Sequence, residues 1–187
     1  MNEKKVQALI RQLLIEIGEN PDREGLKKTP ERVAKSWQFL MQGYKENPRK
    51  VINNALFHSA ASNMIIVRDI EIYSVCEHHL LPFFGRCHIG YIPQDKVLGV
   101  SKFCRLVNVF SRRLQIQEQL TWQIAQEIMQ ATNAEGVGVV IECRHLCKMM
   151  RGVEKQNSIM TTSSVLGSFR EQAATRAEFL TLINRSV

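Results

Sequence analysis

Apolar residues in the first fifty positions recur at the spacing of amphipathic helices. From Val6 to Ile17 they follow the i, i+3, i+4, i+7 pattern, and Gly18 is expected to end this helix. A second apolar stripe follows, where Thr29 is the predicted N-cap and Pro30 takes the first helical position. We expect a helical pair that ends in a polar linker over residues 45–54.

From residue 64 onward the pattern changes to a period of two. Ile70 and Ile72 alternate with Glu71 and Tyr73, as on a strand with one buried face. The predicted strands cover residues 64–75, 84–92, 96–100, 136–150 and 158–166. The predicted helices cover residues 102–113, 116–131 and 168–184. Strands in runs and helices in pairs indicate an α+β fold, not a doubly wound parallel sheet.

The composition is that of an ordinary globular protein. The chain has 187 residues, of which 44% are hydrophobic and 23% charged. The net charge of +7 is spread along the chain, without the basic block typical of a nucleic-acid-binding arm. We therefore expect no nucleic-acid partner, and the length suits one domain with an appendage.

Neither a signal peptide nor a membrane helix is predicted. The N-terminus lacks an apolar h-region, and no apolar run approaches the ~20 residues that a membrane helix needs. We expect a cytoplasmic protein without membrane contact. A reducing compartment would keep its five cysteines free, so that some of them can serve as ligands.

Two short segments contain metal-ligating residue types. Cys76 and His79 are separated by two residues, and His145 and Cys147 share one face of a predicted strand. Two cysteines and one histidine would leave a zinc ion with an open coordination position, as in catalytic sites. The spacing does not decide which of His78, His79 and His145 bind. The alternative is a buried thiol beside loop histidines.

The remaining candidates are weaker. Cys87, His88, Cys104 and Cys143 form no ligand pattern, and we expect packed or incidental side chains.

A cluster of basic residues can also bind a ligand. Lys102 and Arg105 follow Ser101 at the predicted start of a helix, where an anion can bind, and Arg151 is a further candidate. The chain has neither a P-loop nor a GxGxxG motif, and ordinary surface charges remain the alternative.

Gln117 and Glu118 begin the next predicted helix. A carboxylate at Glu118 can accept two hydrogen bonds from a guanidine-like edge. A surface glutamate favoured by the helix dipole is the alternative.

Several long motifs together resemble the GTP cyclohydrolase I family. They are PDREGLKKTPERVAK, SVCEHHLLPFFGRCHIGYIP, GVSKFCRLVNVFSRRLQIQEQLT, HLCKMMRGV and TTSS, in this order along the chain. The resemblance implies the tunnelling fold, an antiparallel sheet with two helices on one face. Residues 1–50 would form the helical appendage and residues 55–187 the catalytic domain. It also implies a homodecamer of two stacked five-membered rings, with active sites between subunits.

The resemblance implies a zinc-dependent conversion of GTP and water to 7,8-dihydroneopterin triphosphate and formate, the first step of pterin and folate biosynthesis. One zinc per subunit would be held by Cys76, His79 and Cys147 and would activate the water that attacks C8 of guanine. His145 would protonate the ring nitrogen, and His78 would assist in proton transfer.

The resemblance also assigns the groups that hold GTP. Glu118, with Gln117 beside it, would bind the guanine edge, and Ser101 would assist the ribose steps. The implied triphosphate ligands are Lys102, Arg105, Arg151, Arg32 and Lys35, of which the last two would be donated to a neighbouring subunit.

Two other functions remain as alternatives. One is a related tunnelling-fold enzyme that acts on a pterin or deazapurine. The other is a zinc-stabilised basic module that binds nucleic acid, against which the scattered charge argues.

Overall fold

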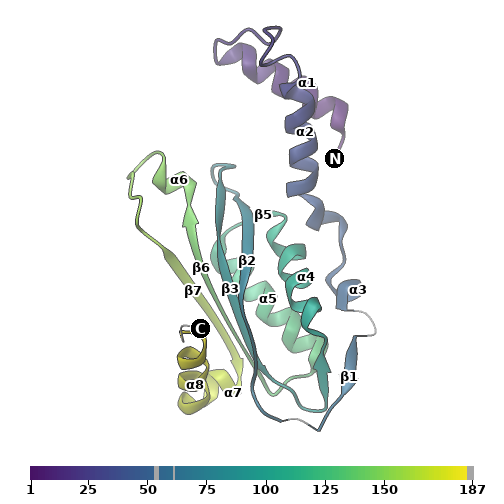
Figure 1. Ribbon diagram of the computed structural model, residues 1–187, viewed down its shortest axis with the longest axis vertical. Coiled ribbons are helices and arrows are strands. Elements are labelled where there is room, and N and C mark those ends of the chain that lie inside the picture. The colour runs from purple at the N-terminus through teal and green to yellow at the C-terminus, as the bar shows by residue number, and fades with distance from the viewer. Residues whose placement is uncertain (53–54, 61, 185–187) are drawn as a thin grey trace. The chain divides into compact units, whose positions relative to one another are not determined.

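A computed structural model describes residues 1–52, 55–60 and 62–184 (Figure 1). The chain divides into two compact units, Met1–Gln42 and Gly43–Val187. The smaller unit consists of α1 (Glu3–Glu16) and α2 (Thr29–Leu40), which pack against each other. Gly18 follows α1 with a φ of 88°, a conformation that favours glycine and ends the helix as predicted.

Two local predictions near this unit are wrong. Lys28 occupies the N-cap position of α2, and the Thr29 hydroxyl donates to the Gly25 carbonyl at 3.4 Å instead of capping the helix. The expected linker over 45–54 contains a short helix, α3 (Pro48–Ile52), preceded by the 3-10 helix η1 (Gln42–Lys45). Residues 53–54 of that segment lie outside the described residues.

In the described part of the larger unit, a five-stranded sheet runs in the order β5-β2-β3-β6-β7, and β1 and β4 form a separate pair. The strands are β1 (Leu56–His58), β2 (Ile65–Cys76), β3 (Pro82–Ile92), β4 (Lys96–Leu98), β5 (Leu114–Gln115), β6 (Gly136–His145) and β7 (Met160–Gly167). Neighbouring strands are antiparallel, except that β5 lies parallel to β2. The mixed α+β class is confirmed, while the expectation of a wholly antiparallel sheet is wrong at β5.

Two helices cover one face of the main sheet, as predicted. They are α4 (Val100–Ser111) and α5 (Gln117–Thr132), and their buried residues share one apolar core with Ile72, Ile89 and Val139 of the sheet. Burial of this apolar surface is the main source of the unit's stability. Gly99 is the N-cap of α4, so this helix begins at Val100 and not at residue 102 as predicted. No helix among the described residues has the length and hydropathy needed to cross a membrane.

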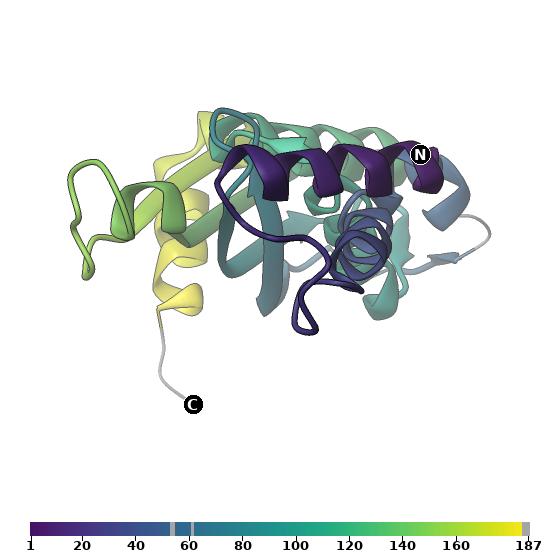
Figure 2. The same cartoon turned by 90° about the horizontal axis from the view of Figure 1, so that it is seen from above.

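The opposite face of the sheet carries the C-terminal helices (Figure 2). The predicted single helix over 168–184 is broken at Gln172, whose backbone is extended, into α7 (Ser168–Glu171) and α8 (Ala173–Ile183). Val140 points to this face because side chains alternate along β6, and it packs with Phe169 and Phe179.

Two neighbouring glycines make room for these phenylalanines. Gly90 and Gly138 are paired across β3 and β6. A Cβ atom at Gly138 would lie 2.6 Å from the ring of Phe169, and one at Gly90 would lie 2.7 Å from the ring of Phe179. The two rings meet edge to face with centroids 5.4 Å apart. The C-terminal helices are thus seated directly on the sheet backbone.

We expect Phe169→Ala to destabilise the larger unit by about 3–5 kcal/mol, because the fully buried ring leaves a cavity over the glycines. Denaturant titration followed by circular dichroism measures the change. Phe57→Ala, at a side chain that is 58% exposed, is the control and should stay within about 1 kcal/mol. Equal losses in both variants would contradict this account of the sheet's second face.

Candidate metal centre

The first two candidate ligands lie at the end of β2. The strand ends at Cys76, and a tight turn follows in which the Cys76 carbonyl accepts from the Leu80 N–H at 2.8 Å. The Cys76 N–H donates to the Leu81 carbonyl at 2.9 Å, and Leu80 takes a φ of 55°. The turn therefore closes on itself and holds His79 next to the buried Cys76.

The third candidate ligand, Cys147, lies in a different element from the predicted one. The expected strand over 136–150 ends at His145, and Cys147 lies in the short helix α6 (Leu146–Met149). The alternation argument that placed His145 and Cys147 on one strand face is therefore wrong. The turn of α6 places the Cys147 side chain instead, and in both views α6 stands at the end of β6 (Figures 1 and 2).

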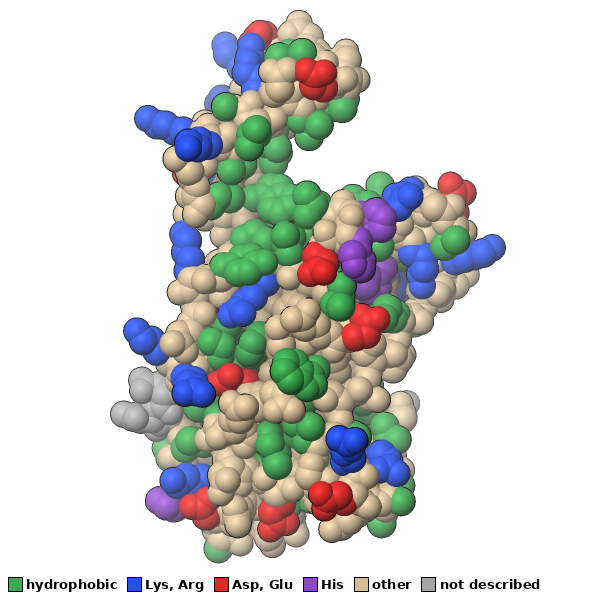
Figure 3. Space-filling view, turned by 180° about the vertical axis from the view of Figure 1, so that it is seen from behind, with side chains coloured by type: hydrophobic (Ala, Val, Ile, Leu, Met, Phe, Trp, Pro, Cys, Tyr) green, Lys and Arg blue, Asp and Glu red, His purple; other side chains and the backbone are tan. Residues whose placement is uncertain are grey.

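Cys76, His79 and Cys147 nevertheless meet. Their ligand atoms all lie within 4.8 Å of one another, which makes them a group that can hold a metal ion. Cys76 is buried, Cys147 half-buried and His79 exposed, so the group opens to solvent on one side. Figure 3 shows histidine side chains gathered at one end of the larger unit, with lysine and arginine side chains beside them.

The electrostatics of the group favour a bound cation. Burial raises the pKa of the Cys147 thiol, and the neighbouring Cys76 raises it further. Two thiolates this close repel each other, and metal coordination is the usual way to keep both deprotonated. Arg151 acts in the opposite direction and lowers the pKa of Cys147, because its positive charge stabilises the thiolate.

His145 lies beside this group in a defined environment. Its ring stacks on Phe83 with centroids 4.6 Å apart and an interplanar angle of 4°. Its Nε2 lies 2.8 Å from Oε1 of Gln117. Burial lowers the pKa of His145, Lys148 lowers it further, and Glu118 partly opposes both. The lowered pKa makes the protonated ring a stronger acid than usual.

The helix residues lie at the starts of α4 and α5. Ser101 and Arg105 are exposed in α4, and the ammonium of Lys102 donates to the Val51 carbonyl at 2.9 Å. Glu118 is exposed in the first turn of α5, directly after the buried Gln117. Glu118 is thus near enough to His145 to affect its pKa.

The other predicted residues are exposed. The rings of His78 and His79 meet edge to face at 6.3 Å, and Arg151 follows α6. Arg32 and Lys35 belong to α2 of the smaller unit, where Lys35 forms an ion pair with Glu31.

Sequence reasoning did not find Phe83, Thr121 and Thr162. Phe83 is opposite His145 in the strand register, and both threonines bond to Gln117. None of them lies in a ligand-like motif, so only the pairing of the strands could have indicated their role.

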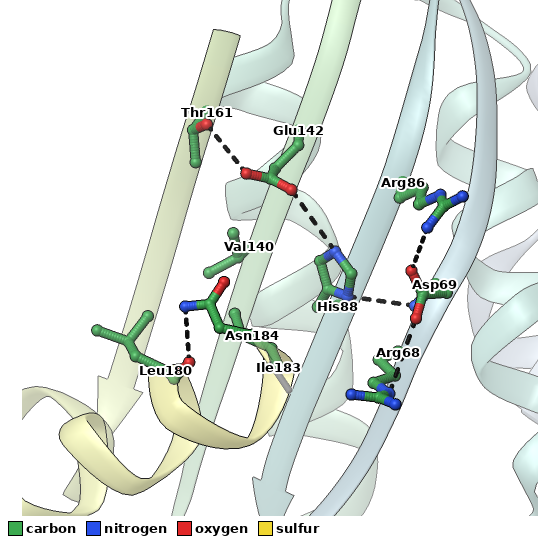
Figure 4. Close-up of a pocket in the computed structure, with 10 residues that line it drawn as sticks. All are labelled: Arg68, Asp69, Arg86, His88, Val140, Glu142, Thr161, Leu180, Ile183 and Asn184. Atoms are coloured by element: carbon green, nitrogen blue, oxygen red, sulfur yellow. Dashed lines mark hydrogen bonds and ion pairs between the residues drawn. The ribbon is translucent and has the colours of Figure 1, made fainter. Parts of the chain in front are cut away.

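A polar cavity of about 560 Å³ lies on the face of the sheet that carries α7 and α8 (Figure 4). Its buried His88 accepts a hydrogen bond at Nδ1 from the Asp69 N–H at 3.2 Å, and Asp69 takes a φ of 59° at a β-bulge. Burial lowers the pKa of His88, against the charges of Asp69 and Glu142. His88, Cys87 and Cys143 are packed side chains, as expected, whereas Cys104 is exposed.

Comparison with known proteins defines the class. The model of the family described as GTP cyclohydrolase I matches residues 6–184. GTP cyclohydrolase 1 of Methylococcus capsulatus is 59% identical over 180 residues, covering 96% of this chain and 97% of the relative. The Campylobacter lari enzyme of that name is 58% identical, covering 97% and 96%, and the Hahella chejuensis enzyme is 57% identical, covering 96% of each chain.

The similarity to a solved structure is much weaker. The archaeosine synthase QueF-Like in its apo form has 17% identity and a TM-score of 0.49, covering 58% of this chain and 97% of that one. At that TM-score the likeness has no bearing on the fold.

The protein is therefore an enzyme with a site that can hold a metal ion. It belongs to the GTP cyclohydrolase I family.

We expect Cys147→Ala to lose its bound metal, because only Cys76 and His79 remain and two protein ligands do not hold the ion tightly. Elemental analysis of the purified protein measures metal per chain. Cys104→Ala is the matched control, since this exposed thiol lies outside the group. Stoichiometric metal in Cys147→Ala would refute the ligand assignment.

Proposed function

We propose that the protein converts GTP and water to 7,8-dihydroneopterin triphosphate and formate, with zinc as its metal. The observation that carries the proposal is the meeting of Cys76, His79 and Cys147 beside His145, in a chain that matches the family along nearly its whole length. This reaction would be the first step of pterin and folate biosynthesis.

Zinc suits the donor set. Two thiols and one imidazole are ligands that zinc prefers, and three protein ligands leave a fourth position for water or substrate. When bound, zinc would polarise a water and lower its pKa toward neutrality, which supplies the nucleophile for C8 of guanine. The protein's own part is to hold the ligands and to move protons around the ring that opens.

His145 is the proposed general acid at the ring nitrogen. Because burial lowers its pKa, the protonated ring gives up its proton more readily than an ordinary imidazolium. His78, exposed on the turn after β2, is proposed to assist in proton transfer. Ring opening and a second hydrolysis would release formate.

Glu118 is proposed to select guanine. An exposed carboxylate in the first turn of α5 can accept hydrogen bonds from the N1–H and the exocyclic amine of guanine. Adenine lacks both donors, so the carboxylate would stay unpaired against it. The resemblance also implies Gln117 as a guanine ligand. Its side-chain amide is buried and bonded to carbonyls of the chain, so the guanine role is proposed for Glu118 alone.

Three cations are proposed to bind the triphosphate. Lys102 and Arg105 lie in the first turns of α4, and Arg151 follows α6. Ser101 is proposed to assist the ribose steps. Arg32 and Lys35 of α2 are proposed to reach the site of a neighbouring subunit.

The same proposal covers fold and assembly. We assign the larger unit to the tunnelling fold, with residues 1–50 as appendage and 55–187 as catalytic domain, of which 185–187 lie outside the described residues. β7 is an edge strand within the described sheet, and pairing between copies would cover such an edge. We propose two stacked pentameric rings with interfacial active sites. Five free thiols suit a reducing cytoplasm.

The direct test is purified protein incubated with GTP. We expect formate and a dihydropterin to appear together, and both to vanish when a chelator removes the metal and to return with added zinc. Absorbance and a coupled formate assay follow the products. Metal-replete protein that releases no formate would overturn the proposal, and a pterin would be the next substrate tested.

We expect Glu118→Ala to lower kcat/KM for GTP by about 10²–10⁴-fold, because two hydrogen bonds to a charged acceptor are lost. The preference for GTP over ITP, which lacks the exocyclic amine, should shrink as well. Steady-state kinetics with both nucleotides measure this. Gln119→Ala, at an exposed neighbour in the same helical turn, is the control. An unchanged GTP-to-ITP ratio in Glu118→Ala would exclude Glu118 as the guanine ligand.

A further inference from the structure

The side-chain amide of Gln117 has only one possible orientation. Gln117 is almost fully buried, and its Nε2 lies 2.9 Å from the Ile141 carbonyl and 2.9 Å from the Met160 carbonyl. Backbone carbonyls only accept hydrogen bonds, so the group that faces them must be the NH₂ group. The amide oxygen Oε1 is therefore the atom that faces His145, at 2.8 Å from its Nε2.

Two threonines reinforce this orientation. The Thr121 hydroxyl donates its single hydrogen to the Gln117 backbone carbonyl at 2.7 Å. The Thr162 hydroxyl lies 2.7 Å from that of Thr121 and must therefore donate to it. Thr162 is left as an acceptor toward Nε2 of Gln117, at 3.1 Å. The directions of both hydroxyl hydrogen bonds and the orientation of the amide are therefore fixed.

The network determines which nitrogen of His145 carries hydrogen. Oε1 of Gln117 can only accept, so Nε2 of His145 must be the donor whether the ring is neutral or protonated. In the neutral ring Nδ1 then has no hydrogen. Within the described residues no hydrogen bond to Nδ1 is present.

We propose that Gln117 is a positioning residue that holds His145 in its Nε2–H tautomer, so that Nδ1 is the atom through which His145 exchanges protons. The catalytic part of this inference rests on the proposed function, and the tautomer does not. Phe83 stacks on the His145 ring and fixes the orientation of the ring plane. Gln117 determines that Nε2 of His145 faces an acceptor.

This role differs from direct binding of guanine. Both hydrogens of the Gln117 amide are taken by three acceptors of the chain, Ile141, Met160 and Thr162. No donor remains for a substrate. Glu118, which is exposed, keeps the guanine role proposed above.

The tautomer can be measured without any turnover. Solid-state NMR of the metal-loaded enzyme, with its histidines labelled with ¹³C and ¹⁵N, distinguishes Nε2–H from Nδ1–H rings, and His145→Gln identifies the signal. We expect the Nε2–H signature for neutral His145 in the natural protein. In Gln117→Met, which removes the acceptor but keeps the length, the Nδ1–H form should appear.

Thr162→Val is the matched control. It removes one contact of Gln117 but leaves both carbonyls that orient the amide, so the Nε2–H signature should persist. An Nδ1–H ring in the natural protein, or an unchanged signature in Gln117→Met, would overturn the proposal.

Kinetics separate positioning from binding. We expect Gln117→Met to lose up to about 10⁴-fold in kcat, the loss seen when a catalytic histidine is left in the wrong tautomer. KM for GTP and metal content should change little. A raised KM with unchanged kcat would instead make Gln117 a substrate ligand and overturn the proposal. If the natural protein does not turn over GTP, the proposed function fails while the NMR result still decides the tautomer.

Discussion

The site depends on the pairing of β3 with β2 on one side and β6 on the other. Val75 pairs with Pro82 across β2 and β3, and Phe83 pairs with His145 across β3 and β6. The ends of two strands that are far apart in sequence therefore meet at the start of β3. A slip of one residue in either register would turn the paired side chains to the opposite face and separate Cys76 from Cys147.

The two-residue strand β5 places the start of α5 beside the end of β2. β5 pairs in parallel with the end of β2, where Gln115 is opposite Cys76, and α5 begins two residues later. Backbone hydrogen bonds between the strands thus bring together His145, the candidate metal ligands and Glu118. This explains how Gln117 can be deeply buried while Glu118 remains open to solvent.

The sequence predicted elements better than it predicted contacts. Alternation along β2 placed Ile70 and Ile72 in the core, and the helical stripes placed α4 and α5, because these signals are local. The end of β6 at His145 was not predicted, since the short segment 146–150 fits a strand and a helical turn equally well. The ligand set followed from spacing and family resemblance, but the partners of Gln117 come from β6 and β7 and depend on tertiary pairing.

The glycine pair under the C-terminal helices has an evolutionary consequence. Gly90 and Gly138 can gain side chains only if Phe169 and Phe179 become smaller, because the rings occupy that volume. These four positions should therefore vary together among relatives, although they are spread over half the chain. Substitutions in the C-terminal helices are thereby coupled to substitutions in the middle of β3 and β6. The end of β6 lies next to the candidate metal ligand Cys147.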